Sequence, residues 1–338
     1  MKSENFFVKK ANQRKLNRFQ EPGSLAFAAG ASTILTLVAV MMSFDIKTRT
    51  FGTTALGVAA VFLMEAAIAL GICMLVRNQI LKNNEISRGV RLLGILLIAT
   101  VANGNIFCAL AGLMLIKKKK NLEYQVGSYM LLVEVLIIMV SAMNVFKPYV
   151  CDTFFLGMGV LAVVILIHAV SLPLVASHVN GNRADKCMIP LGIILIATTV
   201  TGNLLSLLLG IILIRKAYTK DDYVSIGWID VVKRLFRSQM AVLGAFIIVF
   251  LLTLSICATL TFDYSIAVDN DYSLILQNPS LAYPFGTDDY GRCVFTRVVF
   301  GARISLTVGI LSTAISIVAG ILLGAIAGFY SGSTDNII

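Results

Sequence analysis

The sequence predicts an all-α polytopic membrane protein, and three observations lead to this fold class. Of its 338 residues, 58% are apolar and only 14% are charged, whereas soluble domains carry about 25% charged residues. The mean hydropathy is +0.87. The apolar residues also gather in long runs. This combination excludes a cytosolic enzyme, a disordered chain and a nucleic-acid-binding module.

Eight apolar runs are long enough to supply the ~20 residues that cross a bilayer core. Backbone amides in lipid have to form hydrogen bonds within their own segment, so each run is expected to be a helix. About eight transmembrane helices are therefore predicted. The runs are residues 24–44, 54–76, 92–116, 126–146, 153–176, 188–214, 240–262 and 304–329.

The basic residues predict the orientation, because cytoplasmic loops are enriched in Lys and Arg. Eight crossings with the N-terminus inside place 17 of the 28 basic residues in the cytoplasm and give an N-in/C-in topology. The four lysines at 117–120 then fall outside. Either the third run is re-entrant or later helices override this local signal, and we favour the override.

The six cysteines include no C-x-x-C pair and mostly lie in or beside the apolar runs. Their spacing predicts neither a metal site nor a disulfide framework, and no cofactor is expected. Cys187 and Cys293 both face outward in the predicted topology. One bridge between them is possible, although free thiols are the favoured interpretation.

The first half of the chain contains an internal repeat. Residues 93–118 and 191–216 align without gaps at an offset of 98, with 14 of 26 positions identical. We interpret residues 23–216 as a six-helix module built from a duplicated three-helix unit. Because three crossings is an odd number, the copies are expected to insert in opposite orientations, as inverted repeats of secondary transporters do.

Three polar groups interrupt the apolar runs and are candidates for intramembrane function. Glu65 and Glu134 lie near the centres of their runs, where a carboxylate is costly and often functional. The alternative is a protonated acid bonded to a neighbouring helix, through Asn103, Asn105 or Asn203. His168 is interpreted as a packing histidine rather than a metal ligand.

Residues 217–239 mark a domain boundary. Apolar side chains recur there at helical spacing, among them Trp228 and Leu235, and the basic residues follow on the cytoplasmic side. This pattern is typical of an interfacial helix that lies against the membrane. Residues 1–22 form a basic cytoplasmic N-terminus, and residues 240–338 follow as a separate unit with an external loop at 263–303.

A dense motif occupies this external loop and the helix start after it. An apolar Pro-Phe pair is followed by Gly-Thr-Asp, then by Gly-Arg and by Gly-Ala-Arg-x-Ser-Leu. The residues of this motif are Pro284, Phe285, Gly286, Thr287, Asp288, Gly291, Arg292, Arg297, Gly301, Ala302, Arg303, Ser305 and Leu306.

With this motif, residues 228–338 resemble the N-terminal part of the second permease subunit of dipeptide, oligopeptide and nickel ABC importers. Cys293 departs from the family, which usually has aspartate there. The resemblance implies a location in the cytoplasmic membrane. It also implies three kinds of partner besides the lipid: a second permease subunit, cytoplasmic ATPase subunits and an extracytoplasmic substrate-binding protein. The motif loop is expected either to staple two helices or to contact that binding protein.

The last run carries Gly320, Gly324 and Gly328 at four-residue spacing, which allows another helix to approach closely. No P-loop of the form GxxxxGK[ST] and no supported catalytic triad occur in the sequence, so no enzyme is predicted. The favoured function is a permease component of a peptide importer that works by alternating access. The alternatives are a membrane scaffold or regulatory module, and a small proton- or cation-coupled carrier that uses Glu65 and Glu134.

Overall fold

A computed structural model describes residues 12–16, 19–45, 49–117, 121–181, 183–219 and 227–330. Within these residues the fold is all-α apart from two short strand pairs, and six helices are long and apolar enough to cross a membrane. The six are α2 (Glu21–Ser43), α3 (Thr53–Asn83), α7 (Leu122–Ala142), α8 (Phe154–His178), α12 (Gln239–Thr261) and α14 (Val294–Tyr330).

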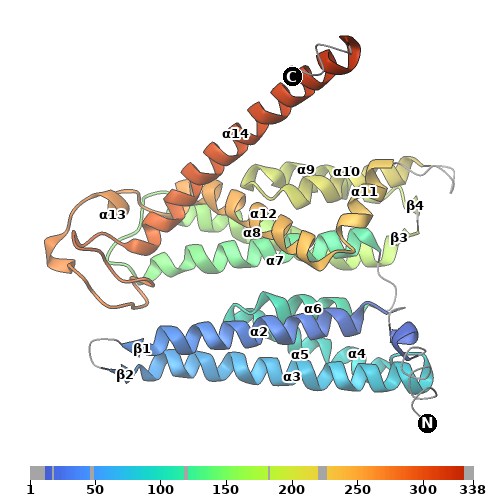
Figure 1. Ribbon diagram of the computed structural model, residues 1–338, viewed down its shortest axis with the longest axis horizontal. Helices are drawn as coiled ribbons and strands as arrows, with labels where there is room; N and C mark the ends of the chain where they lie inside the picture. The colour runs from blue at the N-terminus through green and yellow to red at the C-terminus, as the bar shows by residue number, and fades with distance from the viewer. Residues whose placement is uncertain are drawn as a thin grey trace.

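The long helices run between the same two ends of the molecule (Figure 1). The loop end carries the strand pair β1 (Phe44–Asp45) and β2 (Thr50–Phe51) and the segment between α12 and α14. We call the opposite end the hairpin end. It carries α4 (Arg88–Leu92), α11 (Gly227–Leu235) and the strand pair β3 (Val179–Asn180) and β4 (Arg183–Ala184).

The third apolar run does not cross the molecule, so the predicted crossing there is wrong. The chain turns at Gly104, whose φ is +77°, and the Asn105 side chain caps the helix that follows by accepting a hydrogen bond from the backbone N–H of Cys108 at 3.2 Å. The two arms touch backbone to backbone, because a Cβ on Gly94 would lie 2.6 Å from the Gly112 carbonyl oxygen. These arms are α5 (Gly94–Ile98) with η1 (Ala99–Asn103), and α6 (Ile106–Ile116).

The sixth run folds back in the same way. Its arms are α9 (Met188–Thr198) with η3 (Thr199–Thr201), and α10 (Leu204–Tyr218). Gly202 turns the chain with a φ of +92°, and a Cβ on Gly192 would lie 2.9 Å from the Gly210 carbonyl oxygen. The 15 residues of α10, the longest arm of the two hairpins, span about 22 Å, which is less than the ~30 Å of a bilayer core. Both runs are therefore re-entrant helical hairpins.

The hairpins change the nature of the repeat. Each unit contains two crossing helices and one hairpin, so it begins and ends at the hairpin end (Figure 1). The offset of 98 residues superposes α2 on α7 and α3 on α8 in sequence. The two copies therefore run in the same direction, and the expectation of inverted repeats is wrong because an even number of crossings preserves direction.

The hairpins also change the end of the molecule to which several basic residues are assigned. Lys117 lies at the hairpin end, where its ammonium donates to the Ala176 carbonyl at 3.1 Å near the end of α8. Residues 118–120 lie outside the described part of the chain. Described basic residues at the hairpin end are Arg14, Lys15, Arg77, Lys82, Arg88, Arg91, Lys117, Arg183, Lys186, Arg215, Lys216, Lys233, Arg234 and Arg237; those at the loop end are Arg49, Lys147, Arg292, Arg297 and Arg303.

Two further predictions, about which side of the membrane a segment faces, are wrong. Residues 147–152 lie at the loop end rather than with the N-terminus. Cys187 lies at the hairpin end and Cys293 near the loop end, and both are free thiols. A bridge between them is excluded because the two cysteines lie at opposite ends of the helices.

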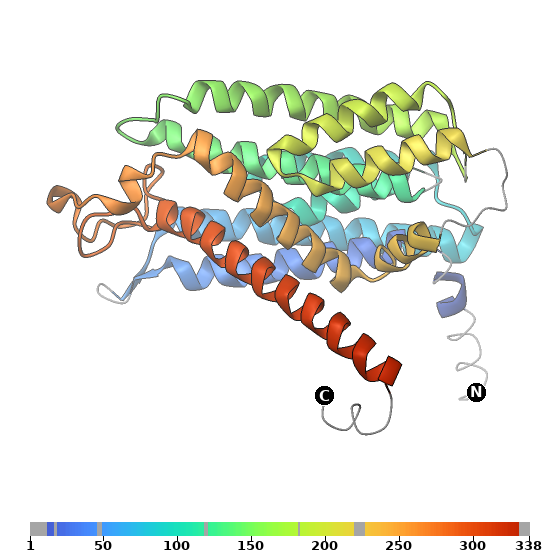
Figure 2. The same ribbon diagram turned by 90° about the horizontal axis from the view of Figure 1, so that it is seen from above.

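Among the described residues, two hydrophobic cores hold the fold together. One belongs to the first unit and includes Leu25, Val76 and Leu115. The other combines the second unit with α12 and includes Met130, Leu209 and Phe246. Figure 2 shows α14 diverging from the bundle towards the C-terminus. In its most apolar window only 6% of the residues are buried, against 39% in α12.

The predicted interfacial helix is present in part as α11, which precedes α12. Its sequence carries Asp230 in the first turn and Lys233 and Arg234 in the last turn, an order that suits the helix dipole. Residues 220–226, the first part of the expected helix, lie outside the described chain.

Candidate functional site: the motif loop

The motif loop joins α12 to α14 through two short helical turns, α13 (Ser265–Val268) and η4 (Tyr272–Leu274). Gly286 and Gly291 have positive φ values of 70° and 76°. A Cβ on Gly291 would lie 1.7 Å from the Asp271 carbonyl oxygen, and one on Gly286 would lie 2.4 Å from the Gln277 carbonyl oxygen. Both positions require glycine, since the backbone conformation and the lack of space each exclude a side chain.

Thr287 joins the two sides of the loop. Its hydroxyl accepts a hydrogen bond from the Gln277 backbone N–H at 2.8 Å and donates to the Leu274 carbonyl. Its backbone also bridges to Cys293, which is fully buried. The motif threonine therefore acts inside the loop and offers little surface to a partner.

Asp288 is the electrostatic centre of the loop. Its carboxylate accepts hydrogen bonds from the backbone N–H groups of Tyr290 and Arg292, at 3.0 and 2.9 Å. It also forms ion pairs with the guanidinium groups of Arg292 and Arg297. Burial alone would raise the pKa of Asp288, but these N–H groups and Arg292 outweigh it and lower the pKa from 3.8 to about 2.

Cys293, where the resemblance led us to expect aspartate, is fully buried. Lys147 comes from the segment after α7, and its ammonium donates to the Thr296 hydroxyl at 2.6 Å and lies 5.4 Å from the centroid of the Phe262 ring. The arginine contacts of the loop are made by Asp288. Lys147 thus ties the repeat module to the first turn of α14.

The motif residues Gly301 and Arg303 lie where the exposed part of α14 begins. No atom of the described chain lies within 4 Å of a Cβ placed on Gly301. Arg303 is exposed and lines an open groove of about 1010 Å³ at the loop end, together with Asp152 and Asp263. The groove lies between the module and α14. Gly320, Gly324 and Gly328 lie farther along this helix, and nothing in the described chain packs on them.

The intramembrane candidate Glu65 contacts two of the expected asparagines. One carboxylate oxygen accepts from Asn103 Nδ2 at 2.8 Å and the other from Asn105 Nδ2 at 2.7 Å. Asn105 also bonds to Ser32, so the cluster joins α2, α3 and the first hairpin. Glu65 is only 2% exposed.

Glu134, the intramembrane candidate of the second unit, lies on α7, which corresponds to α2 in the repeat, whereas Glu65 lies on α3. Its carboxylate accepts from Asn203 Nδ2 at 3.1 Å, and Asn203 follows the turn of the second hairpin as Asn105 follows that of the first. The other carboxylate oxygen of Glu134 has no partner within the described chain. The two acids belong to separate units, and each is bound to its own hairpin.

His168 is a fully buried packing residue in this structure. The Thr198 hydroxyl donates to the Leu195 carbonyl at 2.7 Å. The Thr198 oxygen therefore accepts a hydrogen bond from His168 Nε2 at 3.1 Å. No acidic or thiol side chain joins His168 in a metal-ligating group within the described residues.

The hairpin turns hold the partners of both buried glutamates, but they were not predicted as sites. The signal was present, since Asn103-Gly104 and Gly202-Asn203 are turn-forming pairs in the middle of apolar runs. Length and hydropathy concealed it, because the two arms of a hairpin have the combined length of one crossing helix.

Comparison with known proteins defines the class of the C-terminal third. Residues 228–279 match the family model described as the N-terminal TM domain of oligopeptide transport permease C. No solved structure matches the chain. The C-terminal third therefore resembles the membrane permeases of peptide-type ABC importers, and this resemblance and the six long apolar helices indicate a multi-pass protein of the cytoplasmic membrane.

Particular relatives share this third with the chain. The dipeptide transport system permease protein DppC of Alkalihalophilus pseudofirmus is 39% identical over 120 residues, which is 35% of this chain and 39% of the relative. The glutathione transport system permease protein GsiD of Pectobacterium atrosepticum is 33% identical over 35% of this chain and 40% of the relative. The oligopeptide permease OppC of Bacillus subtilis is 34% identical over 33% and 36%. The chain thus spans about two fifths of these relatives.

Proposed function

We propose that this chain is a permease component of a binding-protein-dependent ABC importer for peptides. The proposal rests on the motif loop. Gly286 and Gly291 have no room for a side chain, and the Asp288 carboxylate accepts a backbone hydrogen bond within the loop. Matched relatives are named for dipeptide, oligopeptide and glutathione transport. In the proposed mechanism separate ATPase subunits drive alternating access, so this chain itself is not an enzyme.

We place the hairpin end in the cytoplasm and the loop end outside. Most of the described basic residues lie at the hairpin end, as the positive-inside rule requires. Both ends of the described chain point towards that end (Figures 1 and 2), which gives an N-in/C-in topology. The motif loop and the groove beside Arg303 then face the compartment from which a binding protein would deliver substrate.

The packing supports different roles for the repeat module and for the region that contains α12 and α14. The repeat module, residues 23–216, packs on α12 through α7, α8 and the second hairpin, where Cys257 Sγ donates to the Thr201 carbonyl at 3.4 Å. It leaves α14 almost entirely uncovered. We propose that the module is a peripheral attachment, and that α14, with Gly320, Gly324 and Gly328, packs against further permease helices.

Uptake by cells tests the transport function. Inactivating the gene in its own host should reduce uptake of a radiolabelled dipeptide at least tenfold and leave uptake of the free amino acid unchanged. Restoring the intact gene should restore uptake, whereas Gly291→Val, which disrupts the loop, should not. Unchanged dipeptide and oligopeptide uptake after inactivation would count against the importer.

Thiol labelling tests the orientation independently. A cysteine introduced at the exposed Asp289 should react with a membrane-impermeant maleimide in intact cells, and one at the exposed Lys186 should react only after lysis. The reverse pattern would exclude the proposed topology.

The carrier alternative is favoured by one observation, the pairing of each buried glutamate with a hairpin asparagine. It predicts that Glu65→Gln and Glu134→Gln abolish proton- or cation-coupled uptake. The importer predicts that both variants retain ATP-dependent peptide uptake. A membrane scaffold predicts no uptake phenotype for any of these substitutions.

A further inference from the structure

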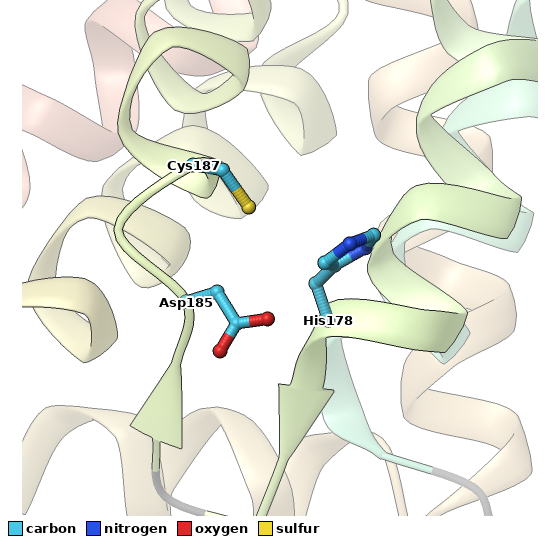
Figure 3. A group of neighbouring side chains, drawn as sticks. All are labelled: His178, Asp185 and Cys187. Atoms are coloured by element: carbon cyan, nitrogen blue, oxygen red, sulfur yellow. The ribbon is translucent and has the colours of Figure 1, made fainter.

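A cluster of three metal-ligating side chains lies at the hairpin end, where α8 leads through β3 and β4 into α9. Figure 3 shows His178 at the end of α8 facing Asp185 and Cys187 on the segment before α9. A ring nitrogen, a carboxylate oxygen and the sulfur lie within 4.8 Å of one another. His178 is half-buried, and the other two side chains are exposed.

The hydrogen bonds of His178 determine its tautomer. Its Nδ1 lies 3.1 Å from the Leu174 carbonyl oxygen, which can only accept, and 2.7 Å from Ser177 Oγ. The Ser177 hydroxyl also contacts the carbonyls of Pro173 and Leu174, so its proton has acceptors other than Nδ1. Nδ1 therefore carries the proton, and Nε2 keeps a free lone pair. Metal-binding histidines typically have this arrangement.

The segment that carries the ligands is braced from three sides. The backbone N–H of Asp185 bonds to the His178 carbonyl at 3.2 Å, which keeps the two ligands opposite each other. Lys216 Nζ donates to the Gly181 carbonyl at 2.6 Å, and Asn121 Nδ2 donates to the Val179 carbonyl at 2.7 Å. Two other helices thus hold the strand pair in place, while no side-chain hydrogen bond within the described chain occupies the Asp185 carboxylate or the Cys187 thiol.

We propose that His178, Asp185 and Cys187 bind a divalent transition metal, with Zn²⁺ as the best fit. Nitrogen, oxygen and thiolate ligands together suit Zn²⁺ and disfavour Mg²⁺ and Ca²⁺, which take oxygen ligands. Tetrahedral Zn²⁺ holds its ligand atoms roughly 3.5 Å apart, so the exposed Asp185 and Cys187 side chains have to close by about 1 Å. The fourth position is left for water or an exchangeable ligand.

A metal at this position would clamp the end of a crossing helix to the start of the second re-entrant hairpin. His178 belongs to α8, and Cys187 is the residue before α9. In the proposed orientation the site faces the cytoplasm, where thiols stay reduced. The spacing H-x6-D-x-C matches no short metal motif, because the strand pair brings the ligands together.

Metal titration of the whole purified chain in detergent tests the site, with Zn²⁺ and Co²⁺ as probes. The wild-type chain should bind one Zn²⁺, and Co²⁺ should give a thiolate-to-cobalt charge-transfer band that Zn²⁺ abolishes. Cys187→Ser should remove the band. His178→Gln and Asp185→Asn should weaken Zn²⁺ binding by at least the ~10- to 100-fold that loss of an outer-sphere partner costs. Cys151→Ser, a partly exposed thiol at the loop end, is the matched control.

A thermal measurement keeps the test independent of activity and of folding defects. Zn²⁺ should raise the unfolding midpoint of the wild type and of Cys151→Ser, because binding to the folded state stabilises it. The three ligand variants should unfold cooperatively without metal and show no such rise. Absence of the cobalt band in the wild type would overturn the proposal. So would a band that persists in Cys187→Ser, or one that Cys151→Ser removes equally.

Discussion

Two long apolar helices of the permease-like region, α12 and α14, have opposite environments. In α12 the repeat module covers one side, and side chains such as Val249 and Leu254 are buried. In α14 the central residues face outward, and Ile310, Ile315 and Ile321 are each more than half exposed. Both helices have strongly apolar windows, with mean hydropathies of 2.7 and 2.3. Hydropathy therefore predicts that a helix lies in the membrane. Only the packing shows whether the helices that contact it belong to this chain.

This contrast predicts that substitutions within the module are costly and that matched ones on exposed surfaces are mild. The largest expected effect is at Lys216, whose ammonium lies 2.6 Å from a fully buried Glu123 carboxylate oxygen. Lys216→Ala leaves that charge unpaired and should destabilise the chain by about 3–5 kcal/mol. Lys233→Ala, which breaks an exposed ion pair with Asp230, should cost at most ~1 kcal/mol. Thermal unfolding in detergent compares the two, and equal shifts would contradict the prediction.

The hairpin glycines come next in expected effect. A Cβ on Gly210 would lie 2.6 Å from the Gly192 carbonyl oxygen, so Gly210→Ala should force the arms apart and cost about 1–3 kcal/mol. Gly324→Ala on α14 meets no atom and should leave the unfolding midpoint unchanged or slightly higher, because alanine favours helix. In a complete permease the same Gly324→Ala should impair assembly if α14 packs there, which co-purification of the other subunits would measure.

A smaller effect is expected where the module joins the permease-like region at the loop end. Asn144 Nδ2 donates to the Thr261 carbonyl at 2.9 Å, and Thr153 Oγ1 donates to the Leu260 carbonyl at 2.9 Å. Asn144→Ala should cost about 1 kcal/mol and loosen α12 from α7. Hydrogen exchange should then rise in the last turns of α12 and remain unchanged in α3. An equal rise in hydrogen exchange in α12 and α3 would show that the Asn144–Thr261 hydrogen bond does not act locally.

The smallest expected effect is a pH dependence confined to the motif loop. Because the pKa of Asp288 is lowered from 3.8 to about 2, its ion pairs stabilise the loop fully above pH 3.8 and are lost as the pH falls through about 2. Pepsin should cut the loop faster at pH 2 than at pH 4, beyond its rate change on an unfolded substrate. Asp288→Asn should remove this pH dependence, whereas Asp289→Asn, at an exposed neighbour, should retain it.

The Asp288 cluster shows how much of the candidate site could be predicted from sequence. The turn glycines and the Asp288–Arg292 pair followed from local spacing, because the residues lie within six positions of one another. The contacts of Glu65 and Glu134 with asparagines were among the alternatives considered. The second arginine on Asp288, the Lys147 contact and the His178 cluster were not predicted, because each depends on how distant or turned segments meet.

The sequence by itself determined the all-α class, the positions of the apolar runs, the internal similarity of residues 93–118 and 191–216, and the resemblance of the last third to peptide-importer permeases. These properties depend on local composition and short motifs, which one chain carries in full. Only the tertiary structure decided that two of the eight runs fold back, that the repeats share one direction and that Lys117 lies with the other basic residues of the hairpin end. The reason is that a crossing helix and a re-entrant hairpin have similar lengths and apolar compositions, and the turns at Gly104 and Gly202 and close contacts such as Gly94–Gly112 distinguish them in the structure.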